Sequence, residues 1–290
     1  MRHRYECPMR WADLDPLGHV NNVVYVDYLQ EARVDLLRAH GRPTATAGLV
    51  EGLVVVRHDV AYLQPLHFRF RPVLIDCWVT EVRAATFTMA YEVYDEDPAA
   101  PEGRTVYVRA TTVLTPYVFS EERPRRLTPE ERATLAALHE EPAPVAASEP
   151  TPARVTDLGH YPVRVRFSDV DVFGHVNNVK YFEYLQEARI VLMSRLWDDL
   201  PAAVRRPAVV VAQTEVDYRR PILFREEPYD SWSWFSHVGR TSAVVESEIR
   251  DGDDVLARAR VVLVFVDETS QRPAAPEPTI RQRLVAFASA

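Results

Sequence analysis

The chain of 290 residues repeats itself, and this repeat limits the possible folds more than any other feature. Residues 10–33 read RWADLDPLGHVNNVVYVDYLQEAR and residues 166–189 read RFSDVDVFGHVNNVKYFEYLQEAR; 16 of the 24 positions are identical. Average composition would give about one or two identities by chance. The offset between the segments is 156 residues, which is 166 minus 10. The sequence therefore indicates two copies of one folding unit.

The repeat continues toward the end of each copy. The further matches are Val60 with Val216, Tyr62 with Tyr218, Pro65 with Pro221, Phe68 with Phe224, Asp76 with Asp230, Trp78 with Trp232, Arg109 with Arg258, and Pro124 with Pro273. They indicate an offset of 156 up to Phe68, of 154 at Asp76 and Trp78, and of 149 from Arg109. We interpret the two changes as short loop deletions in the second copy.

The repeat divides the chain into a first unit of residues 1–138, a linker of residues 139–157 and a second unit of residues 158–290. The linker contains EEPAPVAASEPTPARVTD, which is rich in proline, alanine and acid and has no hydrophobic period. Such a composition predicts a semi-extended connection. Each unit has the length of an ordinary domain with its own core.

Composition and charge exclude several classes of protein. Hydrophobic residues make up 47% of the chain, as in globular proteins with real cores. The formal net charge of −8 argues against non-specific binding to nucleic acid or to an anionic membrane. Cys7 and Cys77 have no metal-site or redox spacing, and the N-terminus has no apolar core of signal-peptide length. No apolar run is long enough for membrane insertion, so we expect a cytoplasmic protein.

Each copy predicts one long helix followed by strands. Tyr25, Leu29, Ala32 and Leu36 recur at helical spacing, as do their counterparts Tyr181, Leu185, Ala188 and Leu192. Asn21 and Asn22 are suitable residues for the helix start, and Gly41 suits its end. A strand over residues 4–10 is expected before the first helix. The strands expected after the helices cover residues 53–63, 75–83, 87–94, 105–117, 208–218, 231–237, 242–249 and 255–266.

This order of elements is an α+β pattern. We expect an antiparallel sheet curved around the helix in each copy, with Gly252 in a hairpin turn between the last two strands. The two copies are expected to pair as an internal pseudo-dimer, and a further homodimer is an open alternative.

The loop before each helix carries the candidate site. Its pattern is D-x-D-x-x-G-H-V-N-N-x-x-Y, which supplies carboxylate, imidazole and carboxamide groups beside a helix N-terminus. The pattern residues that we single out are Asp13, Asp15, Gly18, His19, Val20, Asn21 and Asn22 in the first copy, and Asp169, Asp171, Gly174, His175, Val176, Asn177 and Asn178 in the second.

Such a group of residues suits hydrolysis of a thioester. A carboxylate is a nucleophile or a general base for water, and an imidazole orients it or carries a proton. Unpaired amides at the start of a helix stabilise an oxyanion, and glycine lets a ligand approach the backbone. Asp and Asn near a helix start are also common caps, so a structural role competes with each assignment, most of all at Asn22 and Asn178. We expect Asp13 and Asp169 to be structural or supporting residues.

The stretch DVDVFGHVNNVKYFEYLQEAR, residues 169–189, resembles the motif of the acyl-ACP and 4-hydroxybenzoyl-CoA-type thioesterases, which have the hotdog fold. The resemblance implies a double hotdog of two fused units. It also implies that Asp15 and Asp171 are the catalytic carboxylates, with His19 and His175 at the position of a catalytic histidine. The plant-type enzymes have Asn two residues before this His, where this chain has Leu17 or Phe173. A CoA-type mechanism centred on the Asp is therefore favoured.

Substrate contacts are expected from the loop residues Gly18, Val20 and Asn21 and from their counterparts Gly174, Val176 and Asn177. Arg219 and Arg220, present in the second copy only, suit a phosphate of CoA or the surface of a carrier protein. Glu31 and Glu187, on the helices, are the alternative bases.

The partner implied is an acyl-CoA or an acyl-carrier protein, with CoA or phosphopantetheine as part of the substrate. No bound cofactor and no metal are expected, because the His and Cys residues lack tetrahedral-site spacing. No G-x-S-x-G motif of a serine hydrolase is present. Two alternatives stay open: a non-catalytic protein that binds acyl-CoA or an acyl carrier, and a hotdog-fold dehydratase or hydratase.

Overall fold

The two copies fold into two units of the same design, residues Met1–Ala146 and Ala147–Ala290. The structure is a computed structural model, and it describes residues 2–40, 51–100, 102–141, 151–201, 204–267 and 269–289. The division between the units falls inside the predicted linker. Residues 142–150 of that linker, and Gly41 at the predicted helix end, lie outside the described residues.

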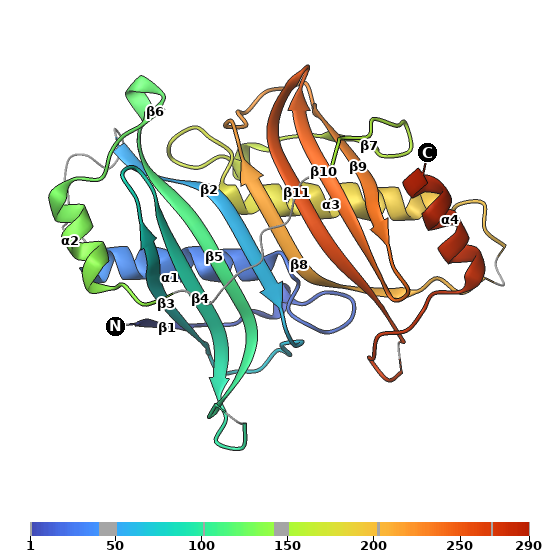
Figure 1. The fold of residues 1–290 in the computed structure, drawn as a ribbon, viewed down its shortest axis with the longest axis horizontal. Helices are drawn as coiled ribbons and strands as arrows, with labels where there is room; N and C mark the ends of the chain where they lie inside the picture. Colours follow the sequence, from blue (N-terminus) through green and yellow to red (C-terminus); the bar gives the residue numbers. More distant parts are fainter. Residues whose placement is uncertain are drawn as a thin grey trace. The chain divides into compact units, whose positions relative to one another are not determined.

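In the first unit one long helix lies across one face of an antiparallel sheet (Figure 1). The sheet order is β1-β3-β4-β5-β2, and β6 pairs with the end of β5. The elements are β1 His3–Cys7, η1 Trp11–Asp13, α1 Val24–His40, β2 Glu51–Tyr62, β3 Val73–Val82, β4 Phe87–Glu96, β5 Arg104–Val118, η2 Phe119–Glu121, β6 Arg123–Pro124 and α2 Pro129–Ala137.

The second unit repeats this plan with the sheet order β8-β11-β10-β9-β7. Its helix α4 is absent from the sequence prediction and packs beside β9 (Figure 1). The elements are β7 His160–Val163, η3 Phe167–Asp169, α3 Asn178–Trp197, β8 Ala208–Tyr218, β9 Tyr229–Val238, β10 Ser242–Asp251, β11 Asp254–Val266 and α4 Pro278–Ser289.

The apolar stripe predicted for each long helix is confirmed. Tyr25, Leu29, Ala32 and Leu36 are buried on α1, and the four equivalent residues are buried on α3. A stripe of this width needs an apolar surface opposite it, which the sheet provides. The predicted hairpin turn at Gly252 is also confirmed, since this glycine has a φ of +57° between β10 and β11.

The strand registers correct one step of the repeat. Trp78 pairs with Ala90 in the first unit, and Trp234 pairs with Glu246 in the second. Both pairs differ by 156 residues, so Trp78 corresponds to Trp234. The offset of 154, based on Asp76 with Asp230 and Trp78 with Trp232, is therefore wrong.

A single deletion accounts for the remaining change. The offset of 156 holds as far as β4 and β10, and β5 and β11 differ by 149. The difference between the two offsets is seven residues. The connection from β4 to β5 beyond the Glu96–Arg104 pair, residues 97–103, also has seven residues. The second unit lacks this hairpin tip. A deletion at a hairpin tip shortens the loop without shifting the register of any strand.

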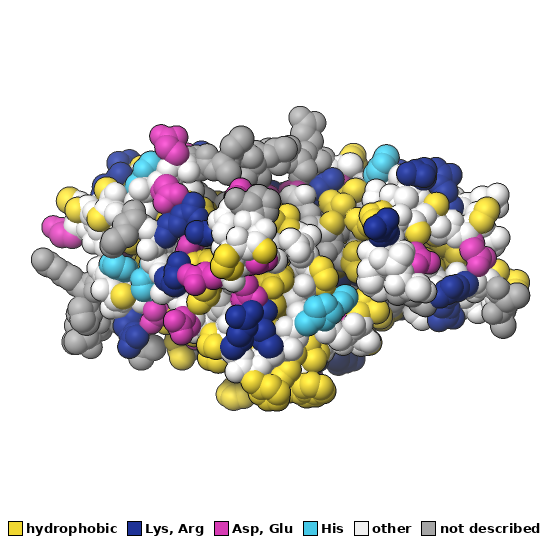
Figure 2. All heavy atoms as spheres, turned by 90° about the horizontal axis from the view of Figure 1, so that it is seen from below, with side chains coloured by type: hydrophobic (Ala, Val, Ile, Leu, Met, Phe, Trp, Pro, Cys, Tyr) yellow, Lys and Arg dark blue, Asp and Glu magenta, His cyan; other side chains and the backbone are white. Residues whose placement is uncertain are grey.

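Several large apolar side chains remain at the surface. Phe70 is 99% exposed and Trp11 is 74% exposed, and in the second unit Phe167 is 83% exposed. On the face drawn in Figure 2, hydrophobic side chains reach the surface beside arginine or lysine and histidine side chains. Exposed apolar groups that cluster at one place mark binding surfaces more often than scattered ones do.

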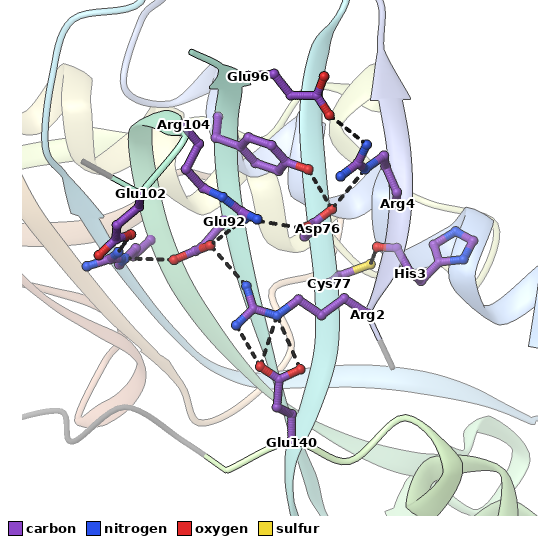
Figure 3. Close-up of polar contacts among 12 residues, drawn as sticks. Arg2, His3, Arg4, Asp76, Cys77, Glu92, Glu96, Glu102, Arg104 and Glu140 are labelled. Carbon is purple, nitrogen blue, oxygen red and sulfur yellow. Dashed lines mark hydrogen bonds and ion pairs between the residues drawn. The ribbon is translucent and has the colours of Figure 1, made fainter. Parts of the chain in front are cut away.

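The sheet face away from α1 carries paired charges in the first unit (Figure 3). The Cys77 thiol lies 3.9 Å from the Ala32 carbonyl oxygen of α1, so its neighbour Asp76 points to the opposite face. There Arg104 lies 3.4 Å from Asp76 and 3.2 Å from Glu92, and Arg2 lies 3.0 Å from Glu92. These carboxylates are nearly buried, and each is paired with arginine side chains. Buried charges are usually paired in this way.

The described ends of the linker are bound to the sheets. The Glu140 amide donates to the Val79 carbonyl at 2.9 Å, and Arg2 pairs with the Glu140 carboxylate at 2.7 Å. In the second unit the Thr151 hydroxyl donates to Glu246 at 2.8 Å. The connection is therefore fixed at both described ends.

Candidate active site

The predicted site loop forms the same tight turn in both units. The Asp15 amide donates to the His19 carbonyl at 2.8 Å, and the Gly18 amide donates to the Asp15 carbonyl at 3.0 Å. Asp171, His175 and Gly174 repeat both hydrogen bonds at the same distances. Gly18 and Gly174 have φ values of +78° and +82°, a conformation that glycine adopts without strain. A β-carbon at either position would meet no atom within 4 Å, so the space beside each glycine is open.

The two candidate carboxylates are half-buried in this turn. Oδ1 of Asp15 accepts from the amides of Leu17 at 2.9 Å and His19 at 3.1 Å, and Oδ1 of Asp171 accepts from Phe173 at 2.9 Å. Within the described parts of the chain, no donor contacts Oδ2 of either residue. One oxygen thus fixes the side chain, and the other is available to a ligand.

Asp13 and Asp169 connect the loop to the helix. Asp13 is only 2% exposed, accepts from the Tyr28 hydroxyl at 2.5 Å, and receives the Asn21 amide on its carbonyl oxygen at 2.8 Å. Asp169 makes the same contacts with Tyr184, at 2.7 Å, and with Asn177. Burial and the bond to Asp13 raise the pKa of the Tyr28 hydroxyl, so it stays a donor at neutral pH. Both aspartates therefore have structural positions.

The helix start has fewer unpaired amides than the sequence suggested. Val20 and Val176 donate to the carbonyls of Leu66 and Ile222 at 2.8 and 2.9 Å, so their amides are already used within the unit. Asn21 and Asn177 act as caps.

The side-chain oxygens of Asn21 and Asn177 accept hydrogen bonds from the amides of Val23 at 3.1 Å and Val179 at 3.0 Å. Of the amides at the start of α1, that of Asn22 has no acceptor among the described residues. The Asn22 carbonyl accepts from the Tyr62 hydroxyl at 2.8 Å, which holds this peptide in place.

The two histidines of the motif have different neighbours. His19 lies opposite His67 in an isolated antiparallel bridge, and the ring centroids are 4.8 Å apart in an edge-to-face arrangement. Burial lowers the pKa of the His19 imidazole, and the His67 ring lowers it further, while Asp15 acts in the opposite direction. His175 lies opposite Leu223. Sequence reasoning missed His67 because only folding brings it to the loop.

The other predicted residues lie at the surface. Glu31 and Glu187 are exposed on their helices. Arg219 and Arg220 are exposed as well, and the Arg220 guanidinium pairs with the Asp254 carboxylate. The structure therefore brings Asp15, Gly18 and His19 together, and it leaves these four residues outside the turn.

No group of three or more His, Cys, Asp or Glu side chains in the described ranges is placed to hold a metal ion. Within the same ranges, no helix has both the length and the apolar character needed to cross a bilayer.

A helix packed on an antiparallel sheet, present twice in one chain with an acidic turn before each helix, defines a double hotdog protein. The sequence model of the thioesterase-like superfamily matches residues 9–138 and 165–284. The chain belongs to this superfamily, and both units carry the family's pattern.

The matches to two relatives are each about as long as one unit. The chain is 40% identical over 113 residues to the uncharacterized protein YsmA of Bacillus subtilis strain 168, covering 37% of this chain and 72% of YsmA. It is 28% identical over 131 residues to the long-chain acyl-CoA thioesterase FadM of Escherichia coli K12, covering 42% of this chain and 93% of FadM. Nearly the whole of FadM thus corresponds to less than half of this chain.

Two solved structures share the fold over almost the whole chain. A putative oleoyl thioesterase from Lactobacillus plantarum aligns with a TM-score of 0.70 and 16% identity, covering 92% of this chain and 96% of its own. The 12:0-ACP thioesterase from Umbellularia californica gives the same TM-score and identity, with 91% and 94% covered. At this identity the likeness concerns the fold.

Proposed function

We propose that the chain is a hydrolase that cleaves the thioester of an acyl-CoA, or of an acyl-carrier protein, to a free acid and a thiol. The single observation that carries the proposal is the acidic turn repeated in both units. In each, one or two backbone amides of the turn bind one oxygen of an aspartate, and no described donor contacts its other oxygen. The glycine of the same turn has open space beside it. The family of the chain and the name of its relative FadM support the same reaction.

In the proposed reaction Asp15 and Asp171 are the reacting carboxylates. Each attacks the thioester carbonyl carbon, or takes a proton from the water that attacks it. The bond from the carbonyl carbon to sulfur then breaks, and the leaving thiolate takes up a proton, from the protonated Asp where water attacks and from solvent where the Asp attacks. Where the Asp attacks, water then hydrolyses the acyl–aspartate anhydride, which releases the free acid and restores the carboxylate. In the first unit two hydrogen bonds of the turn join the His19 backbone to Asp15, and the His19 imidazole orients the carboxylate or carries this proton.

The Asn22 amide is the proposed donor to the oxyanion in the first unit. It is unpaired among the described residues and lies at the positive end of the α1 dipole. Loss of one such donor in an enzyme typically costs about 3–4 kcal/mol of barrier stabilisation. Gly18 allows the substrate carbonyl to come close to the backbone of the turn.

The test is thiol release from acyl-CoAs of varied chain length by the double variant Asp15→Asn with Asp171→Asn. Asparagine keeps the acceptor for the turn amides and removes the charge, so the fold should stay and turnover should fall by about 10²–10⁴. Asp97→Asn with Asp267→Asn is the matched control. These two aspartates accept turn amides in the same manner, at 3.0 Å from Ala99 and 2.8 Å from Ser270, away from the loop.

Full activity of the double variant would refute the site. Tight acyl-CoA binding by the unmodified chain without thiol release would favour a binding protein instead. Conversion of an enoyl-CoA to its hydrated product, with no free thiol, would favour a hydratase.

A further inference from the structure

Three aromatic rings project from the first unit beside the site loop. The rings of Trp11 and Phe68 are 5.5 Å apart and those of Phe68 and Phe70 are 5.0 Å apart, each pair edge to face. Arg69 and Arg71 alternate with the phenylalanines along the chain. We call Trp11 with residues 68–71 the aromatic rim. Phe70 is almost fully exposed and Trp11 mostly exposed, while Phe68 between them is half-buried. The two outer rings therefore gain little from core packing, which indicates a contact surface.

The rim adjoins the candidate site directly. Residue 67 precedes it, and His67 pairs with His19 of the turn through both the backbone bridge and the ring contact. Trp11 begins η1, whose last residue, Asp13, binds the helix start through its carbonyl oxygen. The rim therefore adjoins the turn that carries Asp15.

The second unit lacks this surface. At the offset of 156, Trp11 and Phe68 correspond to Phe167 and Phe224, whose rings are 6.1 Å apart. Phe70 and Arg71, however, correspond to Glu226 and Glu227. The third ring is thus missing, and an acid replaces the arginine.

The charges of the two segments have opposite sign. In the first unit Asp95 pairs with Arg69, and it lies 3.5 Å from Arg71, so two arginines share one carboxylate. Its counterpart Asp251 pairs with Arg225, beside the two glutamates. The local formal charge is therefore +1 in the first unit and −2 in the second. Arg71, whose side chain is well exposed, retains capacity for an anion.

Stacking rings beside a guanidinium suit a ligand that joins a flat aromatic base to a phosphate. We propose that the aromatic rim binds the 3′-phosphoadenosine end of coenzyme A, with the adenine on Phe70 and Trp11 and the phosphate at Arg71. The proposal rests on the thioesterase function for the acyl end of the ligand. It assigns CoA recognition to the first unit, in place of Arg219 and Arg220 in the second.

The binding test needs no turnover. Calorimetry with adenosine 3′,5′-bisphosphate should give one site per chain, and Phe70→Ala or Arg71→Glu should each weaken it about ten-fold. Phe224→Ala in the second unit is the matched control and should leave the affinity unchanged. Phe70 is almost fully exposed, so its truncation removes no core contact.

The kinetic test compares two thioesters of one acyl group. In a background of Asp171→Asn, which leaves only the first site, Phe70→Ala should raise the KM for acyl-CoA about ten-fold and leave kcat unchanged. It should not affect the N-acetylcysteamine thioester, which has no nucleotide. Equal losses with both thioesters, or no binding of the bisphosphate, would overturn the proposal. A KM raised only for an acyl-carrier protein would also overturn it and would make the rim a protein-docking surface. Bisphosphate binding without hydrolysis of either thioester would refute the thioesterase function and leave the rim assignment in place.

Discussion

His67 gives the first unit a site residue that the second unit does not have. The His19 imidazole lies against the His67 ring, and Leu223 takes the corresponding position opposite His175. Burial disfavours the charged form of His19 and lowers its pKa, and a positive charge on His67 acts in the same direction. His19 therefore keeps its neutral form to lower pH than an isolated histidine, against the opposing effect of Asp15.

This contact predicts a pH effect in the first unit. In a background of Asp171→Asn, which leaves only the first site, His67→Leu removes the positive neighbour and raises the pKa of His19. If neutral His19 is the working form, the acid limb of the kcat/KM profile moves to higher pH. A profile that does not move in the His67→Leu variant would remove His19 from the mechanism.

At the scale of elements, the sequence predicted the long helices and the strands well and missed the short helices. Buried residues at steps of three and four define α1 and α3, and this period is visible without any structure. A signal for α2 was present as well, because Thr128 and Glu131 form a capping box around Pro129 at the first helical position. The predicted offset of 154 at β3 was wrong because Asp230 and Trp232 have the same residue types as Asp76 and Trp78, although the strand registers give an offset of 156.

Helix α4 should contribute strongly to the stability of the second unit, although its sequence lies beside a proline-rich stretch. Leu284 is fully buried in a cluster with Trp197 and Phe235. Leu284→Ala should lower the free energy of unfolding by about 2–5 kcal/mol, from lost burial and the cavity left behind. The adjacent Val285 is partly exposed, so Val285→Ala should change it by less than about 1 kcal/mol. Urea unfolding of both variants measures the difference, and equal effects would show that α4 is not part of the core.

At the scale of the whole molecule, the duplication explains both what could be predicted and what could not. Two copies of one motif predicted the fold, the acidic turn and the caps, because these depend on neighbours in sequence. His67 and the aromatic rim could not be placed, because their contact with the turn joins segments about 50 residues apart. The copies also differ at these positions, so the duplication supports two sites that share their turn and differ in their surroundings.

The central claim is that each unit carries its own acidic site, and the rates of the two single variants test it most directly. Thiol release from one acyl-CoA should be measured for the unmodified chain, for Asp15→Asn, for Asp171→Asn and for the double variant. We expect each single variant to keep the activity of the other unit, the two rates to add up to that of the unmodified chain, and the double variant to be inactive. A double variant as active as the unmodified chain would contradict the claim.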